Sequence, residues 1–100
     1  MIYKITKLFP DDERFGLISQ MRRCVISISS NIAEGTYRHT AKDKARFTEI
    51  AYGSALELLN KAILSNDLEF LTNENYEHIR TELTENTVML NTLRKVQIRT

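Results

Sequence analysis

The chain has 100 residues, of which 42% are apolar and 27% charged, with a formal net charge of +1. This length suits one domain that buries roughly 60 to 65% of its unfolded surface, and the mixed charge is typical of a soluble globular protein. No apolar run approaches the ~18 residues of a membrane span, and the N-terminus lacks the basic and apolar regions of a signal peptide. We therefore expect a cytoplasmic protein without membrane contact.

The residues that break secondary structure are scarce. Three glycines and one proline favour long helices joined by short connections, and no segment sustains the alternation of a strand. The one cysteine, Cys24, cannot form an internal disulfide, and its position on a helix favours a small buried hydrophobe over a reactive thiol. The expected fold class is all-α, as a single domain over residues 1–100.

The N-terminal segment, over residues 1–9, has helical spacing at Ile2, Ile5 and Leu8. About two turns are too few to form a helix alone, so this segment must pack on the rest of the chain. Pro10 and the three acidic residues behind it are a helix-entry signal. Because Gly16 follows soon after, residues 10–15 are predicted to form one irregular turn.

A long second helix is predicted over residues 17–34. Its apolar residues recur at steps of three and four, and Ile18 and Val25 widen the stripe. Gly35 is predicted to end the helix in the left-handed conformation. The members of the stripe are Leu17, Met21, Cys24, Ile28 and Ile32.

A third helix is predicted over residues 41–66. Thr40 can cap it, with Asp43 in the third position of a capping box. Its apolar face is broad, so we expect this helix to contact more than one neighbour. One line of that face holds Phe47, Ala51, Ala55, Leu58 and Ala62, and Tyr52, Leu56, Leu59 and Ile63 lie beside it.

The last helix is predicted to begin at Thr72 and to cover residues 73–98. Its apolar residues keep near-heptad spacing, and Asn86 and Gln97 occupy two positions of the same seam. The apolar members are Tyr76, Ile79, Leu83, Leu90 and Leu93. Together the elements predict an antiparallel up-and-down four-helix bundle with a truncated first helix.

Polar side chains form a stripe along one edge of the apolar face of the second helix, since each residue turns about 100°. Ile26 and Ala33 fall on the side opposite the core and make a second, smaller apolar contact. Two interpretations stay open: the stripe is buried between helices or subunits, or it faces water. The stripe residues are Gln20, Arg23, Ser27, Ser30, Asn31 and Glu34.

Basic residues gather in two places despite the small net charge. Arg38, Lys42, Lys44 and Arg46 stand against Asp43 at the start of the third helix, whose N-terminus adds its own positive end. A second cluster at the C-terminus holds Arg94, Lys95 and Arg99. These residues are either phosphate contacts, whose binding would weaken steeply with salt, or ordinary solvated helix faces.

Catalytic patterns are missing from the sequence. It has no phosphate loop, no dinucleotide fingerprint and no metal-binding spacing of cysteine and histidine. His39 and His78 lack a second histidine at helical spacing, and no serine has a base positioned by spacing. We therefore expect neither an enzyme nor a cofactor or metal site.

Three segments resemble successive blocks of the helical-bundle proteins encoded in intervening sequences of bacterial 23S ribosomal RNA genes. They are "IYKITKLFP", "GLISQMRRCVISISSNIAEGTYR" and "RFTEIAYGSALEL". The family also includes an accessory protein of diversity-generating retroelements. The resemblance implies a homopentameric ring with a partly basic surface and, for the retroelement relative, association with a reverse transcriptase and nucleic acid.

The same resemblance implies a long first helix, of which "MIYKITKLF" corresponds to the last turns; if nothing replaces the rest of that helix, one face of the bundle is expected to lie open. Two functions follow as alternatives. The first is an oligomeric accessory protein that binds RNA or DNA through the basic residues. The second is a scaffold for a reverse transcriptase or another protein, without direct nucleic-acid binding.

Overall fold

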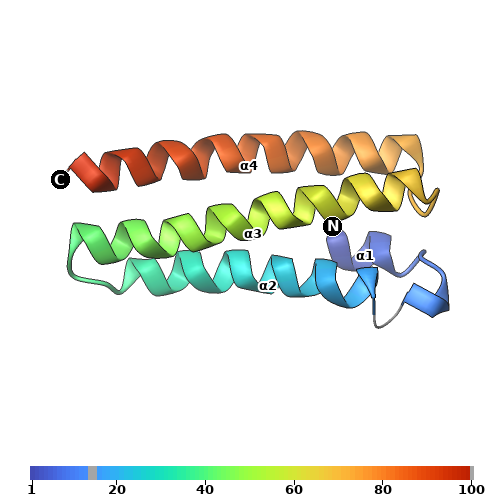
Figure 1. The fold of residues 1–100 in the computed structure, drawn as a ribbon, viewed down its shortest axis with the longest axis horizontal. Coiled ribbons are helices and arrows are strands. Elements are labelled where there is room, and N and C mark those ends of the chain that lie inside the picture. Colours follow the sequence, from blue (N-terminus) through green and yellow to red (C-terminus); the bar gives the residue numbers. More distant parts are fainter. Residues whose placement is uncertain (14–15, 100) are drawn as a thin grey trace.

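The computed structural model describes residues 1–13 and 16–99, which fold into four α-helices and one 3-10 turn. No strand occurs in these ranges, so the prediction of an all-α protein is confirmed. The elements are α1 (Ile2–Thr6), η1 (Asp11–Glu13), α2 (Leu17–Thr36), α3 (Ala41–Asp67) and α4 (Asn73–Arg99), shown in Figure 1.

The three long helices run up, down and up along a rod with dimensions of 45 × 23 × 17 Å. α3 lies in the middle and packs against both α2 and α4, while α2 and α4 have little direct contact (Figure 1). The broad apolar face of the third helix did predict two neighbours. This order leaves a long groove between α2 and α4, on the side away from α3.

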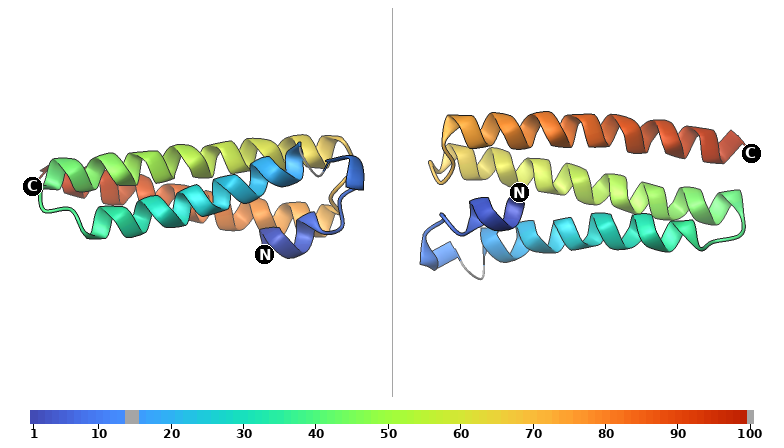
Figure 2. Two further views of the ribbon diagram at one scale, coloured as in Figure 1. Left: turned by 90° about the horizontal axis from the view of Figure 1, so that it is seen from below. Right: turned by 180° about the vertical axis from the view of Figure 1, so that it is seen from behind.

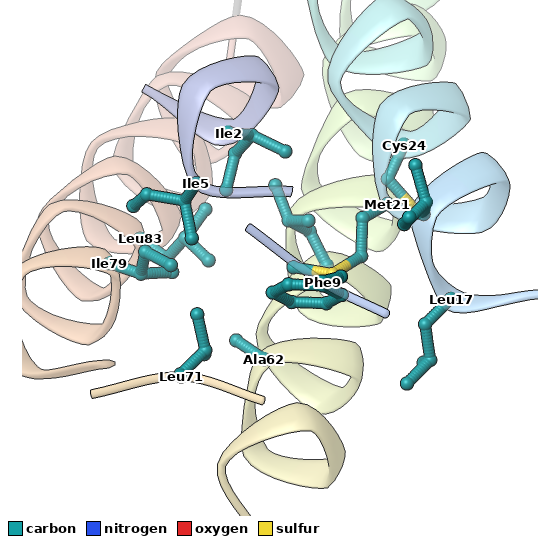
Figure 3. Close-up of a cluster of buried hydrophobic side chains, with 12 residues drawn as sticks. Ile2, Ile5, Phe9, Leu17, Met21, Cys24, Ala62, Leu71, Ile79 and Leu83 are labelled. Atoms are coloured by element: carbon teal, nitrogen blue, oxygen red, sulfur yellow. The ribbon is translucent and has the colours of Figure 1, made fainter. Parts of the chain in front are cut away.

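The short helix α1 occupies one half of the groove between α2 and α4 (Figure 2). Its buried Ile2 and Ile5 approach side chains of α4 (Figure 3). Polar contacts tie it to α2, because Arg22 Nε donates to Thr6 Oγ1 at 3.1 Å and the guanidinium lies 4.9 Å from the centre of the Tyr3 ring. The N-terminal segment therefore packs on the long helices, as its length requires.

The first helix is shorter than the expected range of residues 1–9, and Leu8, which has helical spacing with Ile2 and Ile5 in the sequence, lies outside the helix. The helix ends at Thr6, whose hydroxyl donates to Ile2 O at 2.8 Å. The Phe9 amide then donates to Thr6 O at 3.1 Å, which turns the chain before Pro10. Leu8 is 71% exposed as a result, whereas Phe9 is 5% exposed and takes the core position (Figure 3).

The predicted stop at Gly35 is also wrong, because α2 continues through Thr36 and Gly35 has a helical backbone. A Cβ added at Gly35 would lie 3.2 Å from Phe47 Cβ and 3.7 Å from Lys44 O. Gly35 therefore allows the end of α2 to approach the start of α3 closely. It is not a left-handed cap.

The left-handed residue of the described chain is Glu69, with φ 64°, in the turn between α3 and α4. The turn is closed by the Phe70 amide, which donates to Ser65 O at 2.9 Å. Both long helices that follow a turn are capped by threonine. Thr40 Oγ1 accepts from the Asp43 amide and Thr72 Oγ1 from the Asn75 amide, each at 3.1 Å, which confirms the two predicted helix starts.

The apolar core has two unequal parts. The larger part lies at the α1 end and includes Met21, Leu58 and Ile79 (Figure 3). The smaller one holds Ala51, Ala55 and Leu90. Ile32 and Leu93 were expected in the core but are 46% and 45% exposed, because α1 does not reach this half of the groove.

Candidate nucleic-acid interface

The rod is electrically polar along its length. Residues 34–49 and 91–99 form one end and carry seven arginines and lysines against three carboxylates, a net charge of +4. The opposite, acidic end holds the described residues 1–13, 16–23 and 67–85, which carry nine carboxylates and five arginines and lysines, a net charge of −4 (Figure 1). The two basic clusters, which lie far apart in the sequence, are thus brought together, and we call this part of the molecule the basic end.

The basic end is built by the turn between α2 and α3 together with the last turns of α4. Thr40 caps α3 and fixes its first turn, where the unpaired backbone amides add a partial positive charge. Lys42 and Arg46 follow one turn apart on α3 and are exposed. Arg38, Lys95 and Arg99 are exposed as well, so several cations reach solvent within one region of the surface.

Lys42 and Arg46 line a shallow groove between the start of α3 and the end of α4. Glu49 also lines this groove, and Arg94 Nη1 lies 3.7 Å from its Oε1. Arg94 is therefore partly committed to a bond between α3 and α4. Among the described residues, no ion pair involves Lys42 or Lys95, so these ammonium groups remain available to phosphate oxygens.

Arg38 is held by two contacts. Its Nη2 lies 2.5 Å from Oε1 of Glu34, one helical turn before it, and its guanidinium lies 4.7 Å from the centre of the Phe47 ring. The Arg46 guanidinium lies 6.0 Å from the centre of the same ring. Phe47 was expected in the core but is half-buried under these two arginines, which it helps to hold in place. Sequence reasoning did not assign it to the site.

Lys44 is separated from the other predicted phosphate contacts. It lines the open half of the groove between α2 and α4, next to apolar side chains. Residues two positions apart on a helix point about 200° apart, which places Lys44 on a different face from Lys42 and Arg46. The four cations predicted as one patch therefore serve two surfaces.

The polar stripe of α2 divides in the structure. Ser27 Oγ lies 2.7 Å from Ser54 Oγ of α3, and Asn31 Nδ2 donates to Ser27 O at 2.8 Å and to Ser27 Oγ at 3.2 Å. This part lies between two helices of one chain. The rest of the predicted stripe and its apolar neighbours are exposed: Gln20, Arg23, Ile26, Ser30, Ala33 and Glu34.

Cys24 lies at the edge of the same α2–α3 contact. Its Sγ is 3.9 Å from Glu57 Oε2, and burial, followed by the negative charge of Glu57, raises the pKa of the thiol above its ordinary value. A raised pKa keeps the thiol protonated at neutral pH. Within residues 1–13 and 16–99, no group of three or more histidine, cysteine or acidic side chains is placed to hold a metal ion.

The fold and its surface define a small helical-bundle protein with a cationic end. In the described part of the chain, no helix has the length and apolar character that crossing a membrane requires. The model of the 23S rRNA-intervening sequence protein family matches residues 1–92, and the chain belongs to this family. Comparison with curated proteins found no match.

Proposed function

We propose that this protein is an oligomeric accessory protein that binds RNA through its basic end and has no catalytic role. The observation that carries the proposal is the separation of charge along the rod, +4 at one end and −4 among the described residues of the other. A net charge of +1 spread evenly would attract no polyanion. The same charges sorted to two ends give one surface that attracts phosphates and another that repels them.

Lys42, Arg46 and Lys95 are assigned the main phosphate contacts, with Arg38 and Arg99 beside them. All five are exposed. The shallow surface and the flexible cations suit contacts to the phosphate backbone more than readout of base edges. We therefore expect affinity that depends strongly on salt and weakly on sequence.

The oligomer is proposed as a homopentameric ring, with the subunit number taken from the family resemblance. Ile26 is 55% exposed on α2. Ala33 is also exposed and lies about two helical turns further along the same face. Burial of these side chains against a neighbouring copy would remove apolar surface from water. In a cyclic assembly every copy presents its basic end in an equivalent position, so a modest patch is repeated around the ring.

The test is the affinity for a labelled single-stranded RNA at a series of salt concentrations. Each phosphate contact contributes about 0.7 to the slope of log K against log salt, so the double variant Lys42→Gln, Arg46→Gln should flatten the slope by about 1.4 for each subunit that contacts the RNA. The matched control is Lys4→Gln, Lys7→Gln, which removes two exposed cations at the other end of the rod. Binding that is absent at low salt, or unchanged by the first pair of substitutions, would leave the scaffold as the better assignment.

A further inference from the structure

We propose that Tyr37 stacks on an unpaired base of the bound RNA and, together with the guanidinium of Arg38, makes the basic end favour single-stranded RNA. This role rests on the proposed function, because it names the form of RNA that the same surface would bind. The turn between α2 and α3 lies at the basic end (Figure 1). Tyr37 begins this turn and is 79% exposed, more than any other large apolar or aromatic residue of the described chain.

Tyr37 differs from the other aromatic residues in having no partner inside the chain. Each other aromatic side chain in residues 1–13 and 16–99 lies against a ring or a guanidinium, or packs on the apolar core. These are Tyr3, Phe9, Phe47, Tyr52, Phe70 and Tyr76. Among the described residues, no ring contact or hydrogen bond involves the Tyr37 side chain. The ring is therefore free to stack on a ligand, as aromatic side chains do on unpaired bases.

The backbone at Tyr37 is fixed although the side chain is free. The Tyr37 amide donates to Glu34 O at 3.2 Å, and the Arg38 amide donates to Gly35 O at 3.3 Å. These bonds close the last turn of α2 and hold the ring at a defined place on the surface. Tyrosine has only two side-chain torsions to fix, so stacking on it costs little conformational entropy.

Tyr37 points away from the groove between α2 and α4. It follows Ile28, which lines that groove, by nine positions. At about 100° per residue, nine positions place the two side chains on opposite sides of the helix. The exposure of Tyr37 is therefore independent of what packs in the groove.

Arg38, the next residue, presents a guanidinium whose orientation is fixed. Its Nη2 lies 2.5 Å from Glu34 Oε1, and its guanidinium lies 4.7 Å from the centre of the Phe47 ring. The Arg38 side chain is still 42% exposed, so part of the guanidinium reaches solvent. Because Glu34 already pairs with its charge, Arg38 is better suited to stacking than to a phosphate contact. Guanidinium planes stack on unpaired bases as aromatic rings do.

The cations near the ring indicate a nucleotide as the ligand. Lys42 and Arg46 follow Tyr37 by five and nine positions and are exposed. An RNA backbone held by these two cations keeps its bases close to Tyr37. In a duplex the faces of each base are covered by its neighbours, so only an unpaired base can stack on the ring without first leaving a helix.

The test compares Tyr37→Leu with Tyr37→Phe on a labelled single-stranded RNA and on a duplex of the same sequence. Leucine removes the ring and phenylalanine keeps it, so only Tyr37→Leu should weaken binding to the single strand, by about fivefold or more. Duplex binding and the salt slope should stay unchanged in both variants, because the phosphate contacts are intact. Tyr37 is exposed, so both variants should fold, and circular dichroism checks this.

Arg38→Lys tests the guanidinium separately, because lysine keeps the charge but not the plane. It should weaken the single strand more than the duplex, again with an unchanged salt slope. An equal loss for both forms, or no loss, would mean that Arg38 does not stack and would overturn its part in the proposal.

A cross-link gives a direct readout of stacking. Light joins 5-iodouracil in RNA to an aromatic ring that stacks on it, and mass spectrometry then identifies the residue. We expect the cross-link at Tyr37 in the unaltered chain and its loss in Tyr37→Leu. A cross-link at another residue, or one that Tyr37→Leu leaves in place, would contradict the assignment.

The remaining outcomes separate this proposal from the proposed function. Single-strand binding that Tyr37→Leu does not weaken would overturn the stacking role alone and leave the phosphate contacts in place. Absence of binding to both forms at low salt would remove the proposed function, and the stacking role with it. A lower solution mass of Tyr37→Leu by light scattering would also overturn the role, because a second copy would then cover the ring.

Discussion

Ser27 and Ser54 join α2 to α3 through hydroxyl groups that lie 2.7 Å apart. The sequence "SISSNIAEG" places small polar residues inside a helix that is otherwise amphipathic. Their position is explained by this contact, since Ser27 faces α3 and also accepts from Asn31. The small side chains allow the two helices to pack closely while their polar atoms remain paired.

Ser54→Ala should lower the free energy of unfolding by about 0.5–1.5 kcal/mol, because Ser27 loses one hydrogen-bond partner. Urea unfolding measures this change. Ser30→Ala is the control, since Ser30 is exposed on the same helix as Ser27. The double variant Ser27→Ala, Ser54→Ala should cost less than the two single changes added together. Strict additivity would show that the two hydroxyl groups do not interact.

The two described helical glycines should respond to alanine in different ways. Gly53 is inside α3 with no atom within 4 Å of an added Cβ, so Gly53→Ala should stabilise the protein by about 0.5–1 kcal/mol. At Gly35 the added Cβ would meet Phe47 Cβ at 3.2 Å, and the two helices would have to move apart. Gly35→Ala should lose that gain or destabilise the protein. Equal stabilisation at both positions in thermal unfolding would contradict the close approach.

Ile26→Asp should split the oligomer and leave the helical content unchanged. Ile26 is 55% exposed within one chain, so the new carboxylate remains in water in the monomer but would be buried in the assembly. Light scattering measures the mass and circular dichroism the helix content. Val88→Asp introduces the same charge on α4, where Val88 is 62% exposed. An unfolded Ile26→Asp chain, or a change of mass only with Val88→Asp, would mean that the wrong face has been assigned.

Ionisation of the Cys24 thiol should lower the free energy of unfolding at high pH. Burial and Glu57 raise the pKa of its thiol above the ordinary value of 9.0. Because the folded chain holds this proton more tightly than the unfolded chain, the contribution is fully present below pH 9.0 and is lost as the pH rises through the folded value. Cys24→Ala should remove this part of the pH dependence in urea unfolding between pH 8 and 10.5.

A second readout of the same environment is the rate of Cys24 alkylation by iodoacetamide. Glu57→Gln removes the negative charge beside the thiol, so the pKa of Cys24 should fall and the rate at pH 8 should rise. Glu77→Gln, at an exposed position on α4, is the control. A rate that Glu57→Gln leaves unchanged would contradict the contribution of the Glu57 charge to the raised pKa of Cys24.

The helices could be predicted from the sequence because their signals are local. Residues at steps of three and four, such as Met21 in α2 and Ile79 in α4, are fully buried in the structure. Thr40 and Thr72 mark their helix starts through side-chain caps that need only the following three residues. These features do not depend on how the helices pack.

The errors arise where packing decides. Gly35 resembles a helix stop in the sequence. In the structure its small size leaves room for Phe47, which is 12 positions away in the chain and would lie 3.2 Å from an added Cβ. The left-handed conformation predicted for Gly35 occurs instead at Glu69. The chain reverses there, and the next two side chains, Phe70 and Leu71, pack against the core. The Arg94–Glu49 contact depends on the register of α3 and α4, which no local pattern encodes.

The arrangement of the basic residues could be predicted only in part from the sequence. The proximity of the two basic clusters follows from the alternating direction of the helices, and could be predicted. The separation of Lys44 from Lys42 could also have been found, because neighbouring positions two residues apart do not share a helix face. The uncovered groove was expected only through the family resemblance, since periodicity alone placed Ile32 in the core.

The most direct test of RNA binding through the basic end is photo-cross-linking from each end of the rod. The two histidines are matched positions: His39 is exposed at the basic end and His78 is exposed on α4 at the acidic end. In a Cys24→Ser background, His39→Cys and His78→Cys can each carry one benzophenone, and labelled single-stranded RNA is added at low salt. We predict that RNA cross-links mainly to position 39, and equal yields at both positions, or a higher yield at position 78, would contradict binding through the basic end.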